Sequence, residues 1–364
     1  MNKNLIGIDV QSTLGRKTGL GIYTENLMRS LANESKNGFE FRFYKKSAQS
    51  DLNTFNRWLW ENAELPQQAR KDKVKILHVP AFAPPVFKTF KLVVTVHDLI
   101  GMLFPNQLGW PSRFYWGRWL PFAVKRADRV IADSENTKRD IVNRLGVDEK
   151  KIRVIYPSGH ETFNSQFDPR ALAGLKTQLG IQEKYFLFVG TLEPRKNLGR
   201  TLEAFAKFLK EKKMGIRYQM VVVGSKAFAH GKFFEGLHLP IDLKENDVIW
   251  ADYVDHETLN LLYCGAEAFL FPSLYEGFGI PLLEAMACGA PVLTSNCSST
   301  PEVSGEAALL VDPYDADQMA KAFMDLASNP RLRLDLITRG FQRIKNFSWR
   351  KTAQETFEVY ESLL

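Results

Sequence analysis

The chain of 364 residues is 45% hydrophobic and 24% charged, which excludes disorder as the default and allows two compact domains. Residues 1–150 hold 24 Lys and Arg against 15 Asp and Glu, a net charge of +9, whereas residues 151–364 hold 24 against 26, a net charge of −2. The first half is therefore expected to face an anionic partner.

The ends of the chain and its apolar runs indicate the compartment. No apolar run approaches roughly 18 residues, and the start, MNKNLIGIDV, lacks the apolar core of a signal peptide. Cys264, Cys288 and Cys297 have no paired metal-ligand spacing, which predicts reduced structural thiols. We expect a cytoplasmic protein.

Strand-like stretches alternate with helical stretches along the whole chain. Strands are predicted in the first half at 4–10, 39–45, 75–80, 91–98, 129–134 and 153–157. In the second half they are predicted at 185–191, 217–224, 247–254, 266–273, 290–295 and 307–312. The pattern predicts an α/β protein of two Rossmann-like, doubly wound domains that face each other across a cleft.

The domain boundaries follow from the polar bridge between the two halves. We place the first domain at 1–165, a linker at 166–182 and the second domain at 183–347. The last predicted helix, 348–364, can pack on either domain, including back on the first.

The loop after the first predicted strand contains TGLG, Thr18 to Gly21. Because Gly19 and Gly21 lack a Cβ atom, their backbone amides can come close to a phosphate or a sugar. Many loops contain two glycines, so this motif alone is weak.

His97 follows the apolar run from Leu92 to Val96. A histidine at the carboxyl end of a parallel strand favours a place in the ligand crevice, although a structural histidine is the alternative. Asp98 beside it is interpreted first as a loop residue or helix cap.

The segment from Leu108 to Arg129 alternates aromatic and basic side chains: Trp110, Phe114, Tyr115, Trp116 and Trp119 with Arg113, Arg118, Lys125 and Arg126. This mixture suits an anionic membrane surface, a stacked sugar or nucleic acid. The alternative is that most of the aromatics form the core side of an amphipathic helix. No nucleic-acid-binding motif accompanies the segment, so we expect a membrane surface and no nucleic acid as a partner.

Arg195 and Lys196 follow the predicted strand YFLFVGT where a helix begins. Two cations at that edge can neutralise a diphosphate leaving group, with each charge-assisted contact contributing roughly 1.5–3 kcal/mol. A solvated basic turn is the alternative.

The stretch SLYEGFGIPLLEAMACGAPVLTS, from Ser273 to Ser295, contains two glutamates eight residues apart. Glu276 lies in a strand-to-helix loop, and Glu284 lies about one turn inside a helix predicted from Ile280 to Cys288. Both therefore border a ligand crevice at the carboxyl edge of a parallel sheet. In the alternative interpretation, the glutamates only favour the helix dipole and the glycines only serve a tight turn.

Four motifs, in this order, resemble a retaining glycosyltransferase of the GT-B fold, family 4, over nearly the full chain. They are RKTGLGIYTENL, VVTVHDLIGMLFP, FVGTLEPRKNLGRTLEAF and PSLYEGFGIPLLEAMACGAPVLTS, the last carrying the E-x7-E signature. The resemblance is strongest to mannosyltransferase-type members that build bacterial surface polysaccharides such as O-antigen, capsule or exopolysaccharide.

The resemblance implies that the second domain binds a sugar nucleotide and the first binds a glycan or polyprenyl-diphosphate-linked acceptor. It places Glu284 on the ribose hydroxyls of the nucleotide, Glu276 against the sugar and His97 on the donor sugar. Glu276, His97, Arg195 and Lys196 form the implied catalytic set.

Backbone groups complete the implied donor site. Gly277, Phe278, Gly279 and Ile280 surround the sugar and phosphate, with backbone amides offered to both. Contacts to the base are expected near Trp250 to Val254 and are mostly made by backbone.

Transfer by resemblance retains the anomeric configuration, through front-face departure of the diphosphate and an oxocarbenium-like state. Glu276 then positions the sugar or stabilises positive charge and is not a nucleophile. The expected donor is GDP-mannose, with UDP-glucose, UDP-GlcNAc or a deoxysugar nucleotide as alternatives. The expected location is the inner face of the cytoplasmic membrane, as a peripheral protein.

The chain departs from the family pattern after Gly190, where Thr191 stands in place of a frequent arginine. Phosphate binding then depends on Arg195 and Lys196. Asp315 and Asp317 form a D-x-D sequence, but their context predicts a helix cap. We expect no cofactor and no requirement for a metal.

Two other functions compete with transfer. A GT-B-fold sugar-nucleotide epimerase would act without an acceptor, and the order of the four motifs disfavours it. A non-catalytic module that binds sugar nucleotides or nucleic acid is disfavoured because such a module does not need the complete set of His97, Arg195, Lys196, Glu276 and Glu284.

Overall fold

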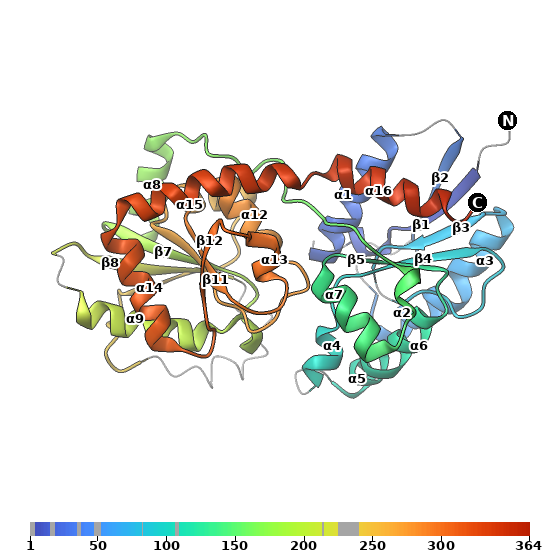
Figure 1. Ribbon diagram of the computed structural model, residues 1–364, viewed down its shortest axis with the longest axis horizontal. Coiled ribbons are helices and arrows are strands. Elements are labelled where there is room, and N and C mark those ends of the chain that lie inside the picture. The colour runs from blue at the N-terminus through green and yellow to red at the C-terminus, as the bar shows by residue number, and fades with distance from the viewer. Residues whose placement is uncertain are drawn as a thin grey trace. The chain divides into compact units, whose positions relative to one another are not determined.

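The computed structural model describes residues 4–14, 19–34, 38–46, 52–81, 83–105, 109–212, 215–224 and 240–364. Their contacts divide the chain into two compact units (Figure 1). The first unit contains Met1–Ser158 and Phe347–Leu364, and the second contains Gly159–Asn346. Each unit is built on one parallel sheet of six strands.

The first sheet has the strand order β2-β1-β3-β4-β5-β6. Its strands are β1 (Asn4–Asp9), β2 (Phe39–Tyr44), β3 (Ile76–Val79), β4 (Lys91–Val96), β5 (Arg129–Ala132) and β6 (Ile152–Val154). Its α-helices are α1 (Gly19–Asn33), α2 (Thr54–Leu59), α3 (Leu65–Lys71), α4 (Ile100–Leu103), α5 (Trp110–Phe114), α6 (Leu120–Lys125), α7 (Glu135–Asp140) and α16 (Trp349–Glu361). Tighter or wider turns are η1 (Gln11–Thr13) and η6 (Glu149–Lys151), which are 3-10, and η2 (Trp60–Glu64), η4 (Tyr115–Trp119) and η5 (Ile141–Leu145), which are π-helical. The order reverses between β1 and β3, which makes this a doubly wound sheet.

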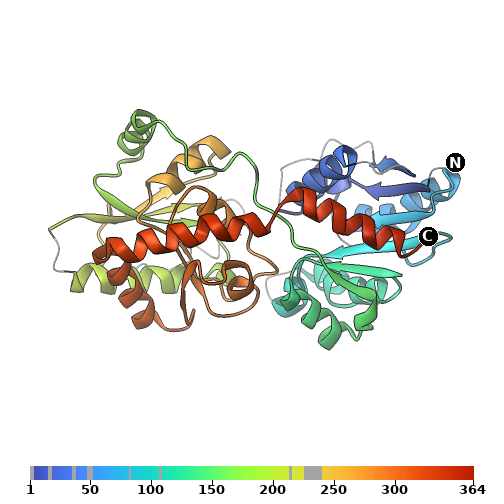
Figure 2. The same cartoon turned by 45° about the horizontal axis from the view of Figure 1, so that its top comes forward.

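Alternate side chains of the first sheet enter separate cores on its two faces. Ile8 and Val93 pack with the aromatic side of α16, whereas Val94 and Val130 pack with η4 and α6. Figure 2 shows the C-terminal helix α16 (red) beside the N-terminal helix α1 (blue), and the two helices pack together through Tyr23 and Trp349. The C-terminal helix therefore belongs to the core of the first unit.

The second sheet has the order β12-β11-β10-β7-β8-β9. Its strands are β7 (Lys184–Val189), β8 (Tyr218–Val223), β9 (Val248–Ala251), β10 (Ala268–Phe271), β11 (Val292–Ser295) and β12 (Ala308–Val311). Its helices are α8 (Pro169–Leu179), α9 (Leu198–Glu211), α11 (His256–Gly265), α12 (Ile280–Ala287), α13 (Thr300–Ser304), α14 (Ala316–Ser328) and α15 (Pro330–Arg343), with 3-10 turns η7 (Pro194–Lys196) and η9 (Ile344–Asn346). Counted from β7, this is the strand order of the Rossmann fold, with its reversal between β7 and β10.

One face of the second sheet carries a large aromatic core. Phe186 and Phe188 of β7 pack there against Phe205 and Phe208 of α9 and Phe323 of α14. This core fixes α9 on the sheet, and with it the turn that precedes α9.

The prediction of two doubly wound α/β domains is confirmed, because all twelve predicted strands are present within a few residues of the expected positions. The cleft between the domains stays a prediction. The boundary lies at Ser158 instead of residue 165, and the predicted linker 166–182 contains helix α8 of the second unit. Asp168 caps this helix, Pro169 begins it and Gly180 ends it in a left-handed conformation. The sequence therefore carried both start and stop signals of a helix, although the polar surface of the segment resembled that of a linker.

Two further expectations from the sequence concern membrane-spanning helices and the cysteines. None of the helices in the described ranges combines the length and apolar character needed to cross a bilayer. Cys264, Cys288 and Cys297 are free thiols, as predicted.

A glycine at the end of β8 is required by close packing. A Cβ atom on Gly224 would lie 2.1 Å from the carbonyl oxygen of Gly190 at the end of β7. We expect Gly224→Ala to lower the free energy of unfolding by at least about 2 kcal/mol, because two backbone segments must separate.

Gly174 provides the matched control, since a Cβ atom there meets nothing within 4 Å and the residue lies inside α8. Gly174→Ala should stabilise the protein by roughly 0.5–1 kcal/mol. Chemical denaturation of both variants checks the pair, and equal effects would contradict the packing argument.

Candidate functional site

The candidate site lies where the strand order of the second sheet reverses. The chain leaves β7 through Gly190 and reaches η7, which presents Arg195 and Lys196, and it leaves β10 through Pro272 toward Glu276. β7 and β10 are hydrogen-bonded neighbours, so these loops meet at the carboxyl edge of the sheet. That reversal is the position at which doubly wound sheets bind ligands.

Four charged side chains form one cluster at this point. Arg195 Nη1 lies 2.8 Å from Glu276 Oε2, and Lys196 Nζ lies 2.7 Å from Glu276 Oε1. Arg195 also pairs with Glu193, which the sequence analysis did not identify, and donates to the carbonyl of Tyr275 at 2.7 Å. Arg195, Lys196 and Glu276 are at most 9% exposed, so this is a buried network and not a solvated basic turn.

The pairing controls the charge of Glu276. Burial alone would raise the pKa of Glu276, but the charges of Lys196 and Arg195 hold this pKa below its ordinary value. Burial lowers the pKa of Lys196, whose ammonium group also lies 4.6 Å from the centre of the Phe271 ring. The carboxylate is therefore held as an anion with both oxygens engaged.

A third loop, after β11, fixes the backbone around Glu276. The amide of Glu276 donates to Ser298 Oγ at 3.0 Å, and Ser299 Oγ lies 3.0 Å and 2.8 Å from the carbonyls of Glu276 and Phe278. Ser298 has a positive φ of 55°, which is uncommon outside glycine. The sequence analysis missed both serines, although they follow a predicted strand directly and so carried the same strand-end signal as Glu276.

Helix α12 begins after Gly279, which has a φ of 106°. Of the first three residues of the helix, Pro281 has no N–H and the amide of Leu282 donates to the carbonyl of Gly279 at 3.0 Å, so the amide of Ile280 is the one suited to an anionic or hydroxyl ligand. Gly277 and Phe278 lie in the loop just before it, beside Glu276. The predicted helix from Ile280 is confirmed, and it ends at Ala287.

Glu284 lies inside α12 and differs sharply from Glu276. In the part of the chain that the structure describes, its partly buried carboxylate makes no hydrogen bond or ion pair. Burial raises the pKa of Glu284 to about 7. A carboxylate in this state gains stabilisation from any ligand that donates hydrogen bonds to it.

Other predicted positions in the second unit have simple structural places. Val254 lies three residues beyond β9, partly buried. Asp315 Oδ1 accepts from the amides of Asp317 and Gln318, so the predicted cap of α14 is confirmed. Among the described residues, no group of three or more His, Cys, Asp or Glu side chains is placed to hold a metal ion.

His97 belongs to the first unit, at the end of β4. Its Nδ1 lies 2.5 Å from Asp133 Oδ2, and its Nε2 lies 2.7 Å from the carbonyl oxygen of Pro80. A ligand that contacts either nitrogen must therefore replace a protein partner. Asp133, which follows β5, was not predicted as a site residue, because its position at a strand end is the only sign of such a role in the sequence.

His97 lines a cavity of about 290 Å³ within the first unit. The lining consists of Leu20, Thr95, Val96, His97, Asp98, Ile100, Gly101, Trp116 and Leu120. Asp98 Oδ1 accepts from the amide of Ile100, so its predicted local capping role is confirmed. The cavity joins the start of α1 to the His97 region.

The two predicted glycines begin α1, and Thr18 of the same motif lies outside the described residues. A Cβ atom on Gly21 would lie 2.5 Å from the carbonyl oxygen of Ser12, whereas one on Gly19 would meet nothing within 4 Å. Gly21 is therefore required by the approach of α1 to η1, and a ligand role for either amide remains a prediction.

The aromatic and basic segment divides between core and surface. Tyr115 is buried, and Trp116 and Trp119 pack against the same core, which agrees with the core alternative for these three. Trp110 is 80% exposed, Phe114 55% and Phe122 48%. Arg113, Arg118, Lys125 and Arg126 are exposed as well, so an amphipathic surface remains.

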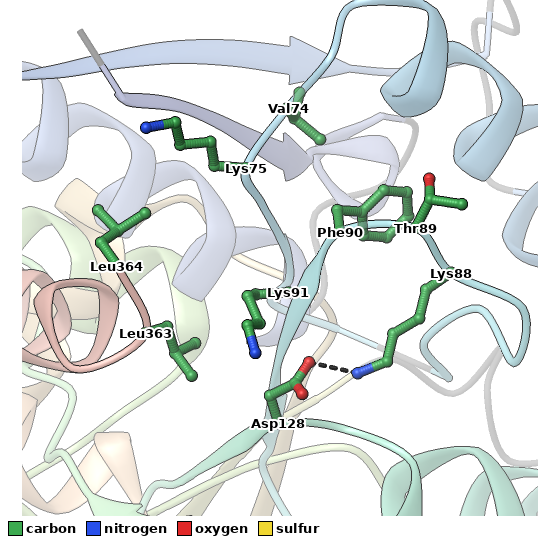
Figure 3. A pocket seen from close by; sticks show the side chains of 9 residues that line it. All are labelled: Val74, Lys75, Lys88, Thr89, Phe90, Lys91, Asp128, Leu363 and Leu364. Carbon is green, nitrogen blue, oxygen red and sulfur yellow. Dashed lines mark hydrogen bonds and ion pairs between the residues drawn. The ribbon is translucent and has the colours of Figure 1, made fainter.

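A second hollow, of about 600 Å³, lies at the opposite edge of the first sheet, where β4 begins (Figure 3). It is lined by Val74, Lys75, Lys88, Thr89, Phe90, Lys91, Asp128, Leu363 and Leu364. Figure 3 shows Asp128 between Lys88 and Lys91, with its ion pair to Lys88. No predicted site residue lies here, and parallel sheets bind ligands at the other edge.

The buried ion pairs of Glu276 with Arg195 and Lys196 should contribute to the stability of the protein. Glu276→Gln removes the anion that compensates Lys196 and Arg195, and we expect it to lower the free energy of unfolding by about 3 kcal/mol at pH 7. Because the pKa of Glu276 is lowered on folding, its contribution is present above the unfolded pKa and is lost as the pH falls through the folded pKa. The difference between variant and wild type should therefore shrink in acid.

Denaturant titrations at pH 7 and in acid check this dependence. The control is Glu203→Gln, since Glu203 is 52% exposed and pairs with Lys207 four residues on, a contact worth at most about 0.5 kcal/mol. A Glu276→Gln loss as small as that of the control would contradict a compensating role.

Comparisons with known proteins agree with this architecture. The family profile described as "Glycosyl transferases group 1" matches residues 175–343, and "Glycosyltransferase Family 4" matches residues 19–158. O-antigen chain mannosyltransferase B of Escherichia coli is 29% identical over 294 residues, which cover 81% of this chain and 76% of that protein. Serotype-specific mannosyltransferase WbdA of Escherichia coli is 27% identical over 279 residues, which cover 76% of this chain but only 34% of WbdA.

Solved structures share the fold over the full chain. A glycosyltransferase from Rickettsia africae ESF-5 has a TM-score of 0.77 at 18% identity, covering 100% of this chain and 99% of that chain. Anabaena HepE in complex with UDP and glucose has a TM-score of 0.72 at 18% identity, covering 99% and 100%. The chain thus belongs to the glycosyltransferases, with a Family 4 first part, a group 1 second part and the GT-B fold.

Proposed function

We propose that this glycosyltransferase transfers mannose, with retention of configuration, from GDP-mannose to a glycan or polyprenyl-diphosphate-linked acceptor in the synthesis of a bacterial surface polysaccharide. The observation that carries the proposal is the buried cluster of Arg195, Lys196 and Glu276 at the strand reversal, with Glu284, which has no partner among the described residues, in the adjoining helix. Mannose as the sugar is supported by two relatives that are mannosyltransferases, O-antigen chain mannosyltransferase B and WbdA of Escherichia coli.

The chemical logic begins with the diphosphate. Arg195 and Lys196 are the cations at the strand reversal, and each contact to phosphate contributes roughly 1.5–3 kcal/mol. The donor diphosphate takes over part of the bonding that Glu276 now has, which frees that carboxylate to face the sugar. The two cations stabilise the charge that develops on the leaving group, and the proposed transfer therefore requires no metal.

The state of Glu276 supports retention without a covalent intermediate. The pKa of Glu276 is lowered by its cations, and a carboxylate that keeps even one of them when the diphosphate binds is a weak nucleophile, so its proposed role is to orient the sugar or to stabilise positive charge in the transition state. Attack and departure then occur on the same face of the sugar.

Glu284 is the proposed ribose ligand. Its carboxylate can accept hydrogen bonds from both hydroxyls of a ribose, and the amide of Ile280 at the start of α12 can serve the neighbouring phosphate or sugar. A UDP-sugar is the second candidate donor, because HepE, which shares the fold, is solved with UDP and glucose. Ribose and diphosphate are common to both donors, so the residues named here do not separate them.

Calorimetric titration of the metal-free protein with GDP-mannose, GDP, UDP-glucose and UDP tests the donor. We expect the GDP series to bind and Glu284→Gln to weaken GDP-mannose binding about 10-fold to 100-fold, as expected for lost hydrogen bonds to a charged group. Tighter binding of the UDP series would replace the GDP-mannose proposal with the UDP alternative.

The pH dependence gives a sharper test of Glu284. With a pKa of about 7, the carboxylate is mostly protonated at pH 6 and ionised at pH 8, so the affinity for GDP-mannose should rise by up to about tenfold between them. The diphosphate diester of GDP-mannose keeps its charge over this range. Glu284→Gln should remove the pH dependence, and an unchanged slope in that variant would assign it to another group.

We also propose that the first unit docks on an anionic membrane surface through the exposed part of the segment 109–129. Trp110, Phe114 and Phe122 expose apolar rings among exposed cations, and the guanidinium of Arg126 lies 5.7 Å from the Phe122 ring. Arg126 also donates to the carbonyl of Val86 in the loop before β4, and the exposed Phe87 follows directly in that loop.

Sedimentation with vesicles that contain anionic lipid tests the docking. Each Lys or Arg near such a surface contributes about 1 kcal/mol, so reversal of Arg113 and Arg118 to Glu should reduce partitioning at least about tenfold. The control is reversal of the exposed Lys210 and Lys321 in the second unit. Equal losses in both double variants would show a general charge effect and overturn the assigned surface.

A further inference from the structure

Two histidines of the first unit, His78 on β3 and His97 just after the neighbouring strand β4, have different surroundings: His78 is fully buried, whereas the side chain of His97 is 14% exposed. His78 of β3 has Nδ1 2.7 Å from the hydroxyl of Tyr360 and Nε2 2.9 Å from Thr95 Oγ1. A hydroxyl group can donate or accept, so a neutral ring satisfies both contacts. Burial lowers the pKa of His78 to about 3, and this histidine is neutral.

His97 has partners of the other kind. The carbonyl of Pro80 only accepts hydrogen bonds, as does the ionised carboxylate of Asp133. The two contacts, at 2.7 and 2.5 Å, therefore need a proton on each side of the ring, whereas a neutral imidazole carries only one. A proton on Nε2 serves the Pro80 carbonyl, and the proton between the ring and Asp133 Oδ2 is assigned to Nδ1 of His97.

The surroundings of the ring favour the same state. Tyr23 of α1 packs edge-on with its ring centre 4.5 Å away, Asp98 is the next residue, and His78 is the nearby neutral base. Burial alone would lower the pKa of His97, but the negative charge of Asp133 and the bond to it raise this pKa above its ordinary value. The start of α7 holds the backbone, because Thr137 Oγ1 donates to the carbonyl of His97.

We propose that Asp133 is a positioning residue that holds His97 in its doubly protonated form at the wall of the 290 Å³ cavity, so that His97 meets a ligand only as a hydrogen-bond donor. Its ligand atom is then an oxygen acceptor, such as a sugar hydroxyl or a phosphate, reached from Nε2 in place of the Pro80 carbonyl. His97 in this form cannot take a proton from an attacking hydroxyl. The role of His97 in sugar transfer rests on the proposed function, whereas the protonation state of His97 does not depend on it.

Nuclear magnetic resonance of protein labelled with ¹⁵N-histidine tests the proposal, with His97→Gln used to assign the signals. At pH 7 we expect one-bond N–H couplings on both ring nitrogens of His97 and on only one of His78. In Asp133→Asn the asparagine amide can donate to Nδ1, so the doubly protonated fraction should fall below about one tenth. Asp98→Asn, which changes a neighbouring carboxylate that the ring does not contact through a hydrogen bond, should leave both couplings in place.

A wild-type His97 with a single N–H at pH 7 would overturn the proposal, and so would a doubly protonated ring in Asp133→Asn. If Asp133→Asn does not fold, the wild-type spectrum and Asp98→Asn still decide the question. Titration of the wild-type protein with GDP, which has no mannose for His97 to contact, reports on the second unit separately. Failure to bind GDP with an intact His97 signature would count against the proposed donor, whereas GDP binding without that signature would count against the role of Asp133.

Discussion

The pairing of Glu276 with Arg195 and Lys196 is the interaction on which the rest of the site depends. Buried charges are costly unless each is compensated, and here two cations meet two carboxylates, Glu193 and Glu276. The pairing joins the loop after β7 to the loop after β10, and Ser298 and Ser299 add the loop after β11. A cluster that is balanced without a ligand can exchange one anion for another, and this is what diphosphate binding requires.

Glu276 and Glu284 show how environment separates two identical side chains in one short segment. Cations lower the pKa of Glu276 and fix both of its oxygens, whereas burial without a cation raises the pKa of Glu284 to about 7. The carboxylate of Glu276 is held in place and is charged near neutral pH, whereas the carboxylate of Glu284 is stabilised by ligand hydroxyls that donate hydrogen bonds to it. The proposed division into a sugar ligand and a ribose ligand follows from this contrast.

The sequence predicted the fold well because parallel strands buried on both faces leave continuous apolar runs, as in Leu92 to Val96. The same rule located Arg195, Lys196, Glu276 and His97 at strand ends. It could not predict their partners, because the bond from Lys196 to Glu276 spans 80 residues and that from His97 to Asp133 spans 36. Such contacts depend on which strands are neighbours, and no local sequence pattern predicts the order of strands in a sheet. Helix α8 was missed for the opposite reason, since it has clear local caps but a mostly polar surface and no fully buried residue.

The protonation states of Glu276, Lys196 and His97 bear on which group accepts the proton of the attacking hydroxyl. Glu276 is held as an anion by two cations, Lys196 pairs with it, and His97 already carries a proton on each nitrogen if Asp133 acts as proposed. None of these side chains is then suited to remove a proton from an attacking hydroxyl. In the proposed transfer the departing diphosphate has the free, increasingly basic oxygen, and on the same face of the sugar it is next to that hydroxyl. In the proposed transfer, retention and the removal of the acceptor proton would then have one physical origin, the use of the leaving group itself as the proton acceptor.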